Sequence, residues 1–137
     1  MEIKPYLLFN GRCDEAIAFY RTALGAEPVM LMRFKDSPED LDPARVSPAM
    51  ADKVMHAQIR IGESVVLLSD GACTEGAGFG GFNLTLTVRD EAEADRAFAA
   101  LAEGGKVQMP LAKTFFSPRF GMLQDRFGVG WIVYVTP

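Results

Sequence analysis

The sequence is poor in the residues that most often build metal centres and disulfide frameworks. Its 137 residues include two cysteines, Cys13 and Cys73, and one histidine, His56. The cysteines form no CxxC pair, and one histidine cannot supply a two-histidine metal site within one subunit. The N-terminus has no basic segment followed by an apolar run, so we expect no signal peptide. We therefore expect a cytoplasmic protein in which both cysteines are free thiols.

Two further deficits exclude whole classes of partner. Acidic residues outnumber basic ones by 18 to 14, which gives a net charge of −4, and lysine and arginine form no cluster. Because nucleic-acid binding depends on a basic surface, we expect no nucleic-acid partner. The apolar runs, such as 65–68, are far shorter than the ~20 residues of a membrane-spanning helix, so we expect no membrane partner.

What the sequence does contain is an internal repeat. Phe19, Gly25 and Met30 recur 79 positions later, whereas Gly62 recurs as Gly128 after 66 positions. The shorter offset indicates an extra segment in the first half, roughly residues 35–52. Its prolines and acids predict a polar loop, either a lid over a site or a tolerated surface insertion.

Apolar periodicity predicts the same order of elements in both halves. In the first half we expect strands at 5–9, 28–34, 54–61 and 64–69 and a helix at 14–24. In the second half we expect strands at 83–88, 106–116, 121–125 and 131–135 and a helix at 91–102. The fold is therefore expected to be α+β, one domain over residues 1–137. Module one covers about 1–70, a glycine-rich linker about 71–81, and module two about 82–137.

Two β-α-β-β-β modules can bury their apolar faces by forming a strongly curved mixed sheet, with the helices outside and a concave cleft inside. The offset of 66 pairs His56 with Met122, Gln58 with Gln124, Arg60 with Arg126 and Val66 with Ile132. Period-two alternation then predicts the polar side chains that line the cleft: Tyr6, His56, Gln58, Asn83, Thr85 and Gln124.

Several of these side chains are candidates for chemistry. The ordinary pKa of imidazole suits proton transfer, so His56 is a candidate general base or substrate contact, although a lone histidine is also typical of a structural role. The two glutamines could bracket a ligand carbonyl, or they could be polar groups on a wet sheet face. The aromatic side chains at or near strand positions predict either an aromatic wall for a planar ligand or core packing: Tyr6, Phe115, Phe116, Trp131 and Tyr134.

Three stretches carry a resemblance to a known family: PYLLFNGRCDEAIAFY (5–20), MHAQIRIGESVVLLSD (55–70) and FGMLQDRFGVGWIV (120–133). Together they resemble the vicinal oxygen chelate superfamily, which includes glyoxalase I, bleomycin-resistance proteins and extradiol dioxygenases. The similarity is greatest to its PhnB-like branch, often labelled 3-demethylubiquinone methyltransferase-like. Homodimers are common in this superfamily, and the resemblance implies one here.

The resemblance also implies positions for a divalent metal, with one ligand from each leading and each closing strand of the two modules. These positions fall near 4–6 and at Val66, Asn83 and Ile132, and none holds a glutamate or histidine. We therefore expect no metal and no other cofactor. The sequence favours a protein that binds a small, partly apolar or planar molecule. The alternatives are a lyase- or isomerase-type enzyme that uses His56, Gln58 and Gln124, with or without a metal, and a purely dimeric interaction module.

Overall fold

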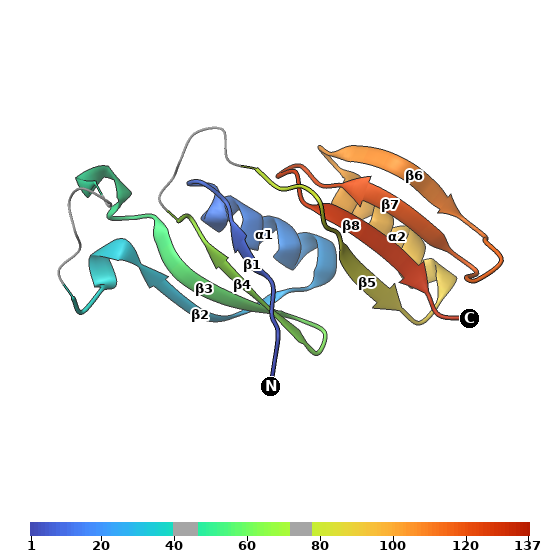
Figure 1. The fold of residues 1–137 in the computed structure, drawn as a ribbon, viewed down its shortest axis with the longest axis horizontal. Coiled ribbons are helices and arrows are strands. Elements are labelled where there is room, and N and C mark those ends of the chain that lie inside the picture. The colour runs from blue at the N-terminus through green and yellow to red at the C-terminus, as the bar shows by residue number, and fades with distance from the viewer. Residues whose placement is uncertain (40–46, 72–77) are drawn as a thin grey trace. The chain divides into compact units, whose positions relative to one another are not determined.

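Figure 1 shows the chain as a computed structural model, which describes residues 1–39, 47–71 and 78–137. The chain consists of two compact units, unit 1 (Met1–Ala77) and unit 2 (Gly78–Pro137). Each unit contains a strand, a helix and three further strands, in the order that the internal repeat predicts.

Unit 1 is a four-stranded mixed sheet with one long helix. Its elements are β1 (Tyr6–Leu8), α1 (Cys13–Leu24), β2 (Glu27–Arg33), β3 (Val54–Ile61) and β4 (Ser64–Ser69). The strand order is β1-β4-β3-β2, with β1 parallel to β4 and the other neighbours antiparallel. The segment expected to be a polar loop contains two short 3-10 helices, Phe34–Asp36 and Pro48–Met50, and its residues 40–46 lie outside the described residues.

Unit 2 repeats this arrangement. Its elements are β5 (Leu84–Val88), α2 (Glu91–Ala102), β6 (Lys106–Ala112), β7 (Phe120–Gln124) and β8 (Gly130–Val135). The strand order is β5-β8-β7-β6, and β5 is parallel to β8 just as β1 is parallel to β4.

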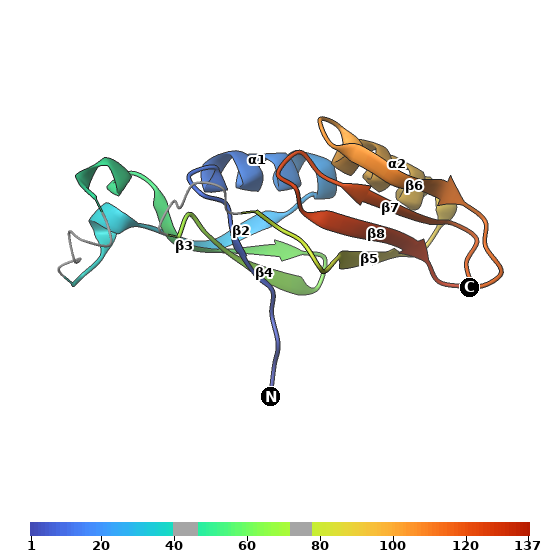
Figure 2. The ribbon, with the colours of Figure 1, turned by 45° about the horizontal axis from the view of Figure 1, so that its top comes forward.

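Each helix covers one face of its own sheet (Figure 2). In unit 1, α1 packs against β3, and its buried Ala16, Ile17 and Tyr20 face strand residues such as Ile59 and Leu68. In unit 2, α2 packs against all four strands through Ala94, Ala97, Phe98 and Leu101, and the buried strand residues are Leu123, Trp131, Val133 and Val135. Burial of these apolar side chains is the main stabilising contribution in each unit.

The two helices begin differently. Asp90 caps α2 in the usual way, because its carboxylate accepts the Glu93 backbone N–H at 2.8 Å. Arg12 provides no such cap for α1. Instead Asp70, which follows β4, accepts the backbone N–H groups of Gly11 at 2.8 Å and Cys13 at 2.9 Å. Its carboxylate also fits the positive end of the helix dipole.

The α+β class, the two tandem modules and the two helices are confirmed. The ends of some strands differ from the prediction: β6 stops at Ala112 because residues 114–117 form a turn, in which the Thr114 backbone N–H donates to the Ser117 carbonyl at 2.9 Å. Of the predicted linker, residues 72–77 lie outside the described residues. Among the described residues, the helices are too short or too polar to cross a membrane.

Candidate functional site

The two faces of the unit 1 sheet differ in character. Along β1, β3 and β4 the residues that face α1 are buried: Leu7, Ala57, Ile59, Val66 and Leu68. Side chains alternate along a strand, so the residues between them lie on the opposite face. We call this face the open face of unit 1, and it carries Tyr6, His56, Gln58 and Leu67.

A short hydrogen-bonded chain crosses the open face of unit 1. Tyr6 Oη lies 2.9 Å from His56 Nδ1, and Gln58 Nε2 lies 3.2 Å from His56 Nε2. Tyr6 belongs to β1 and the other two residues to β3, so the hydrogen-bonded side chains reach across β4, which lies between these strands. The backbone register explains how the residues meet, because Leu67 of β4 pairs with Tyr6 on one side and with Gln58 on the other. Both ring nitrogens of the only histidine are thus engaged.

The surroundings of this polar chain are apolar. Leu67 lies between Tyr6 and Gln58 in the register, Met30 of β2 pairs with Gln58, and Met32 pairs with His56. Tyr6 remains 47% exposed. A flexible apolar rim around a few fixed polar groups is typical of surfaces that bind small molecules.

The corresponding face of unit 2 is aromatic rather than polar. Phe116 lies in the loop before β7, with ring-centroid distances of 5.0 Å to Phe120 and 6.4 Å to Tyr134. Phe120 is edge-on to both of the other rings. Phe115, next to Phe116, is 100% exposed. We call Phe116, Phe120 and Tyr134 the aromatic cluster of unit 2.

The loop that carries Phe116 is held in place by a buried serine. Ser117 Oγ lies 2.6 Å from the Val135 carbonyl oxygen and 2.7 Å from the Arg119 carbonyl oxygen, and its single hydroxyl proton is donated to this pair of acceptors. Ser117 is buried, whereas Phe115 and Phe116 are exposed. The loop therefore presents aromatic side chains at the surface from an anchored backbone.

The remaining residues predicted for the site in unit 2 have separate environments. Thr85 is exposed on β5 and pairs with Ile132. Gln124 donates its amide N–H to the Gly128 carbonyl at 3.1 Å, within its own loop. Asn83 precedes β5 and lies against Gly130, where an added Cβ would approach Asn83 Oδ1 to 2.3 Å.

Trp131 does not lie with the aromatic cluster. It is on the helix-facing side of β8, only 4% exposed, and its indole N–H donates to Asp125 Oδ2 at 2.9 Å. Tyr134, three positions later, lies on the other face, as the alternation of burial along β8 shows. Trp131 is thus a core residue with a satisfied polar group.

The register also corrects the pairing of the two halves. In unit 1 Ala57 pairs with Leu68, and in unit 2 Gly121 pairs with Val133 in the same way. Residues of β3 therefore match residues of β7 at an offset of 64, and residues of β4 match residues of β8 at an offset of 65. The counterpart of His56 is therefore Phe120 rather than Met122, and that of Gln58 is Met122 rather than Gln124. The uniform offset of 66 was wrong because β7 and β8 are joined by a longer connection than the two-residue turn between β3 and β4.

This correction changes the residues at the metal-ligand positions. Val66 faces α1 and is buried, whereas its open-face neighbour Leu67 is the register counterpart of Ile132. Leu67 and Ile132 have hydrocarbon side chains and cannot ligate a metal. No group of three or more histidine, cysteine, aspartate or glutamate residues suited to a metal occurs in the part of the chain that the structure describes. The residues present do not fit the ligand set of the superfamily.

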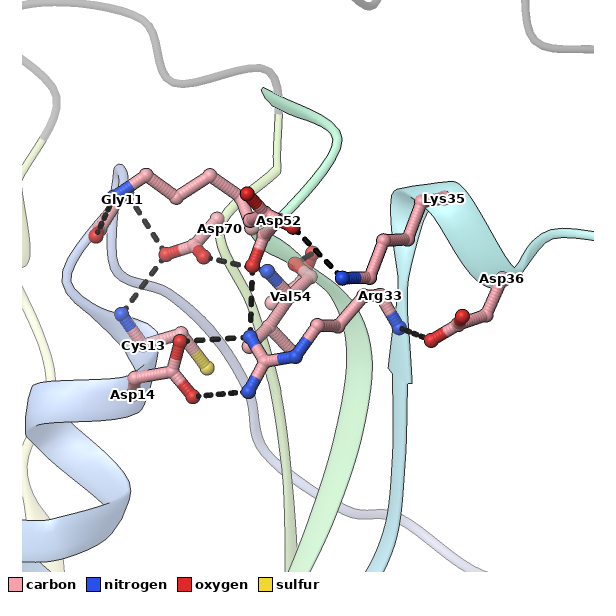
Figure 3. Close-up of polar contacts among 11 residues, drawn as sticks. Gly11, Cys13, Asp14, Arg33, Lys35, Asp36, Asp52, Val54 and Asp70 are labelled. Atoms are coloured by element: carbon pink, nitrogen blue, oxygen red, sulfur yellow. Dashed lines mark hydrogen bonds and ion pairs between the residues drawn. The ribbon is translucent and has the colours of Figure 1, made fainter. Parts of the chain in front are cut away.

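A second polar cluster, which the sequence patterns did not reveal, lies at the N-terminus of α1 (Figure 3). Arg33 forms two hydrogen bonds with the Asp14 carboxylate, at 2.8 and 3.0 Å, and a third with the Asp52 carbonyl at 2.8 Å. Lys35 pairs with the Asp52 carboxylate at 2.8 Å. These contacts fasten both ends of the inserted segment to the sheet and to α1.

The charges of this second cluster shift several pKa values. The hydrogen bond from Arg33 lowers the pKa of Asp14, and the hydrogen bond from Lys35 lowers the pKa of Asp52. Burial, followed by the nearby Asp70 and Asp14 carboxylates, strongly raises the pKa of the Cys13 thiol. Since the thiolate is the reactive form, this cluster is structural rather than nucleophilic.

Comparison with known proteins identifies the family to which this chain belongs. Residues 2–133 match the Glyoxalase/Bleomycin resistance protein/Dioxygenase superfamily. The chain belongs to this superfamily, and the family prediction is confirmed.

Individual relatives place the chain more closely. Protein YjdN of Escherichia coli K12 is 36% identical over 141 residues, covering 99% of this chain and 96% of YjdN. The crystal structure of PA1353 from Pseudomonas aeruginosa has a TM-score of 0.85 and 43% identity, covering 99% of this chain and 98% of that one. A PhnB protein from Bacillus cereus has a TM-score of 0.81 and 28% identity, covering 99% and 100%. These relatives agree with the PhnB-like branch.

Proposed function

We propose that this protein binds a small, partly apolar or planar molecule without the metal usual in its superfamily. The observation that carries the proposal is the Tyr6–His56–Gln58 chain on the open face of unit 1. Three hydrogen-bonding side chains from two strands are gathered there among Leu67, Met30 and Met32. The polar groups would fix the orientation of a ligand while the apolar rim supplies contact area.

The aromatic cluster of unit 2 supports the same proposal independently. Its rings are partly exposed and lie on an anchored loop and two strands. Exposed aromatic rings offer large, rigid contact surfaces with a small entropic cost on binding. This surface suits a planar or apolar group.

A thermal-shift screen against divalent metals and a metabolite library tests the binding proposal. We expect stabilisation by one or more organic compounds, and we expect His56→Phe and Phe116→Ala to reduce it. Stabilisation by a metal alone, with stoichiometric metal in the purified protein, would overturn the metal-free proposal.

The second candidate is an enzyme of the lyase or isomerase type. The specific observation in its favour is the pairing of the His56 ring with the Tyr6 hydroxyl, because a hydroxyl–imidazole pair can move a proton. Compounds found by the screen should then be tested for conversion by chromatography. Turnover that His56→Ala abolishes, with the circular dichroism spectrum unchanged, would favour the enzyme over the binding protein.

The name of the B. cereus relative also includes a 3-demethylubiquinone-9 3-methyltransferase activity. The described residues give no support for methyl transfer. Nucleotide-type methyl donors need a pocket such as that of a doubly wound parallel sheet, and the two sheets described here are mixed four-stranded sheets.

We further propose that the protein is a cytoplasmic homodimer. The edge strands β2 and β6 expose apolar side chains, among them Val29, Leu31, Val107 and Met109. Exposed apolar edges of this kind are usually covered by another chain or element. Sedimentation velocity should show a dimer at micromolar concentration, and a monomer at that concentration would contradict the proposal.

A further inference from the structure

The hydrogen bonds of His56 determine where its proton lies. The Gln58 amide nitrogen, 3.2 Å from His56 Nε2, carries only hydrogens and can only donate. His56 Nε2 must therefore be the acceptor. A neutral imidazole then has its single proton on Nδ1.

This proton position fixes the role of Tyr6. His56 Nδ1–H donates to Tyr6 Oη, 2.9 Å away, so the phenol oxygen is an acceptor in this bond. The Tyr6 hydroxyl proton is then left for another partner. Within residues 1–39, 47–71 and 78–137, the structure records no further hydrogen bond of the Tyr6 hydroxyl.

We propose that Tyr6 donates its hydroxyl proton to an oxygen atom of the ligand, and that Gln58 positions it for this role by holding His56 as the Nδ1–H tautomer. This inference rests on the proposed function, because it requires the ligand to lie on the open face of unit 1. It narrows the class of expected ligands to compounds that have a carboxylate or another oxygen acceptor next to an apolar group. A phenol that already accepts a hydrogen bond is a stronger donor, and an anionic oxygen makes the stronger bond with it.

The tautomer can be measured without any ligand. His56 is the only histidine, so a long-range ¹H–¹⁵N spectrum of histidine-labelled protein contains the signals of one ring. At pH 8 we expect the chemical shift of a protonated nitrogen at Nδ1 and that of a bare nitrogen at Nε2. The reverse pattern would overturn the inference while leaving ligand binding on this face open to its own test.

Two substitutions of Gln58 test its positioning role. In Gln58→Glu the carboxylate can only accept, so we expect the proton to move to Nε2 and the two nitrogen shifts to exchange. Gln58→Leu removes the donor and should shift the tautomer population toward Nε2–H. Gln108→Leu makes the same change at an exposed position of β6 and should leave the spectrum unaltered. If none of the three substitutions alters the spectrum, the positioning role of Gln58 is contradicted.

The donor role of Tyr6 is tested with matched probes, benzoate and benzylamine, which share a ring but differ in the head group. In NMR titrations we expect benzoate to shift the His56 signals at lower concentration than benzylamine does. Tyr6→Phe should weaken benzoate binding by about tenfold, as loss of a hydrogen bond to a charged group implies. The effect of Tyr6→Phe on benzylamine should be small.

The outcomes separate the inference from the proposed function. Equal binding of both probes, or benzoate binding that Tyr6→Phe leaves unchanged, would overturn the donor role of Tyr6. If the ligands found by the thermal-shift screen still lose affinity in His56→Phe, the proposed function stands without this inference. If substitution of His56 and substitution of Tyr6 both leave the affinity for those ligands unchanged, both proposals fail.

Discussion

The buried carboxylate of Asp70 takes the place of the N-cap side chain that α1 lacks. It is completely buried and accepts backbone N–H groups from Gly11, Cys13 and Val54, the last at 2.8 Å. These donors belong to the turn before α1, to the first residue of α1 and to β3, so one side chain joins the helix and the sheet to the segment that follows β4. The motif SVVLLSD in the sequence shows the residue but gives no indication of these three partners.

Replacing Asp70 should therefore destabilise the protein strongly. Asp70→Asn points an amide NH₂ at backbone donors and leaves at least one buried N–H without an acceptor. We expect a loss of ~3 kcal/mol or more in the free energy of unfolding, measured in urea. Asp52→Asn, whose side chain is largely exposed, should change the free energy of unfolding far less. A similar small effect of both substitutions would contradict the structural role of Asp70.

Cys13 should be chemically inert in the folded protein. It is buried beside Asp70, and burial raises the pKa of its thiol far above the ordinary value. In a Cys73→Ser variant, iodoacetamide at pH 8 should leave Cys13 unmodified in buffer and alkylate it in urea, as measured by mass spectrometry. Alkylation in buffer at the rate of a small free thiol would contradict this burial.

The Asp14–Arg33 pair should make a small, pH-dependent contribution to stability. Arg33 lowers the pKa of Asp14, so the stabilisation is present above the ordinary carboxyl pKa and is lost as the pH falls through the lowered value. We expect Asp14→Asn to cost ~0.5–1 kcal/mol at pH 7, because the Asp14 side chain is 55% exposed. In urea titrations this difference should disappear as the pH falls below the lowered pKa of Asp14. A difference of equal size at neutral and at strongly acidic pH would contradict the assignment.

At the scale of elements, the sequence allowed both helices and every strand to be predicted, but not the register between strands. Helix 91–102 was predicted with its observed bounds, because its apolar spacing and the glycines that follow it agree. Register depends on loop length and on which face is buried, and a shift of one residue moves a side chain to the other face. Val66 was therefore expected on the wrong face, and Leu67 and Phe120 were overlooked. Of the two roles predicted for Trp131, ligand contact and core packing, its burial fits core packing.

Alternation along β7 places Phe120, Met122 and Gln124 on one face. These three residues are half-buried, and Gly121 and Leu123 between them are buried. Alternation fixes the face of a side chain but not a shift of two residues, so the match of Phe120 with His56 needed the observed register. The Tyr6–His56 hydrogen bond could not be predicted from the sequence, since it joins β1 to β3 across β4.

Gly121 offers a test of the register in unit 2. It occupies the position of Ala57, but a Cβ there would lie 2.8 Å from Phe98 Cε2 and 3.0 Å from the Leu111 backbone nitrogen. Gly121→Ala should lower the free energy of unfolding by ~1–3 kcal/mol through overpacking. Gly80→Ala, which meets open space, is the matched control and should be nearly neutral. A neutral Gly121→Ala would contradict the close approach of α2 and β6 to this position.

At the scale of the whole molecule, two units of one architecture carry different surfaces. The internal repeat has kept the strand order, the parallel β1–β4 and β5–β8 pairs and the helix on one face of each sheet. The open face of unit 1 holds a polar chain, whereas unit 2 has the aromatic cluster at the matched strands. Membership of the superfamily is established by sequence, and the matched open-face positions Leu67 and Ile132 carry hydrocarbon side chains.

The central claim is that the open face of unit 1 binds a small molecule through Tyr6, His56 and Gln58. Its most direct test is the dissociation constant of the strongest organic ligand from the thermal-shift screen, measured by calorimetry for the unaltered protein and for His56→Phe. We predict an increase of about tenfold or more in the dissociation constant, with the fold intact, because the imidazole that holds the Tyr6 hydroxyl in place for the ligand is lost. An unchanged dissociation constant would contradict the claim.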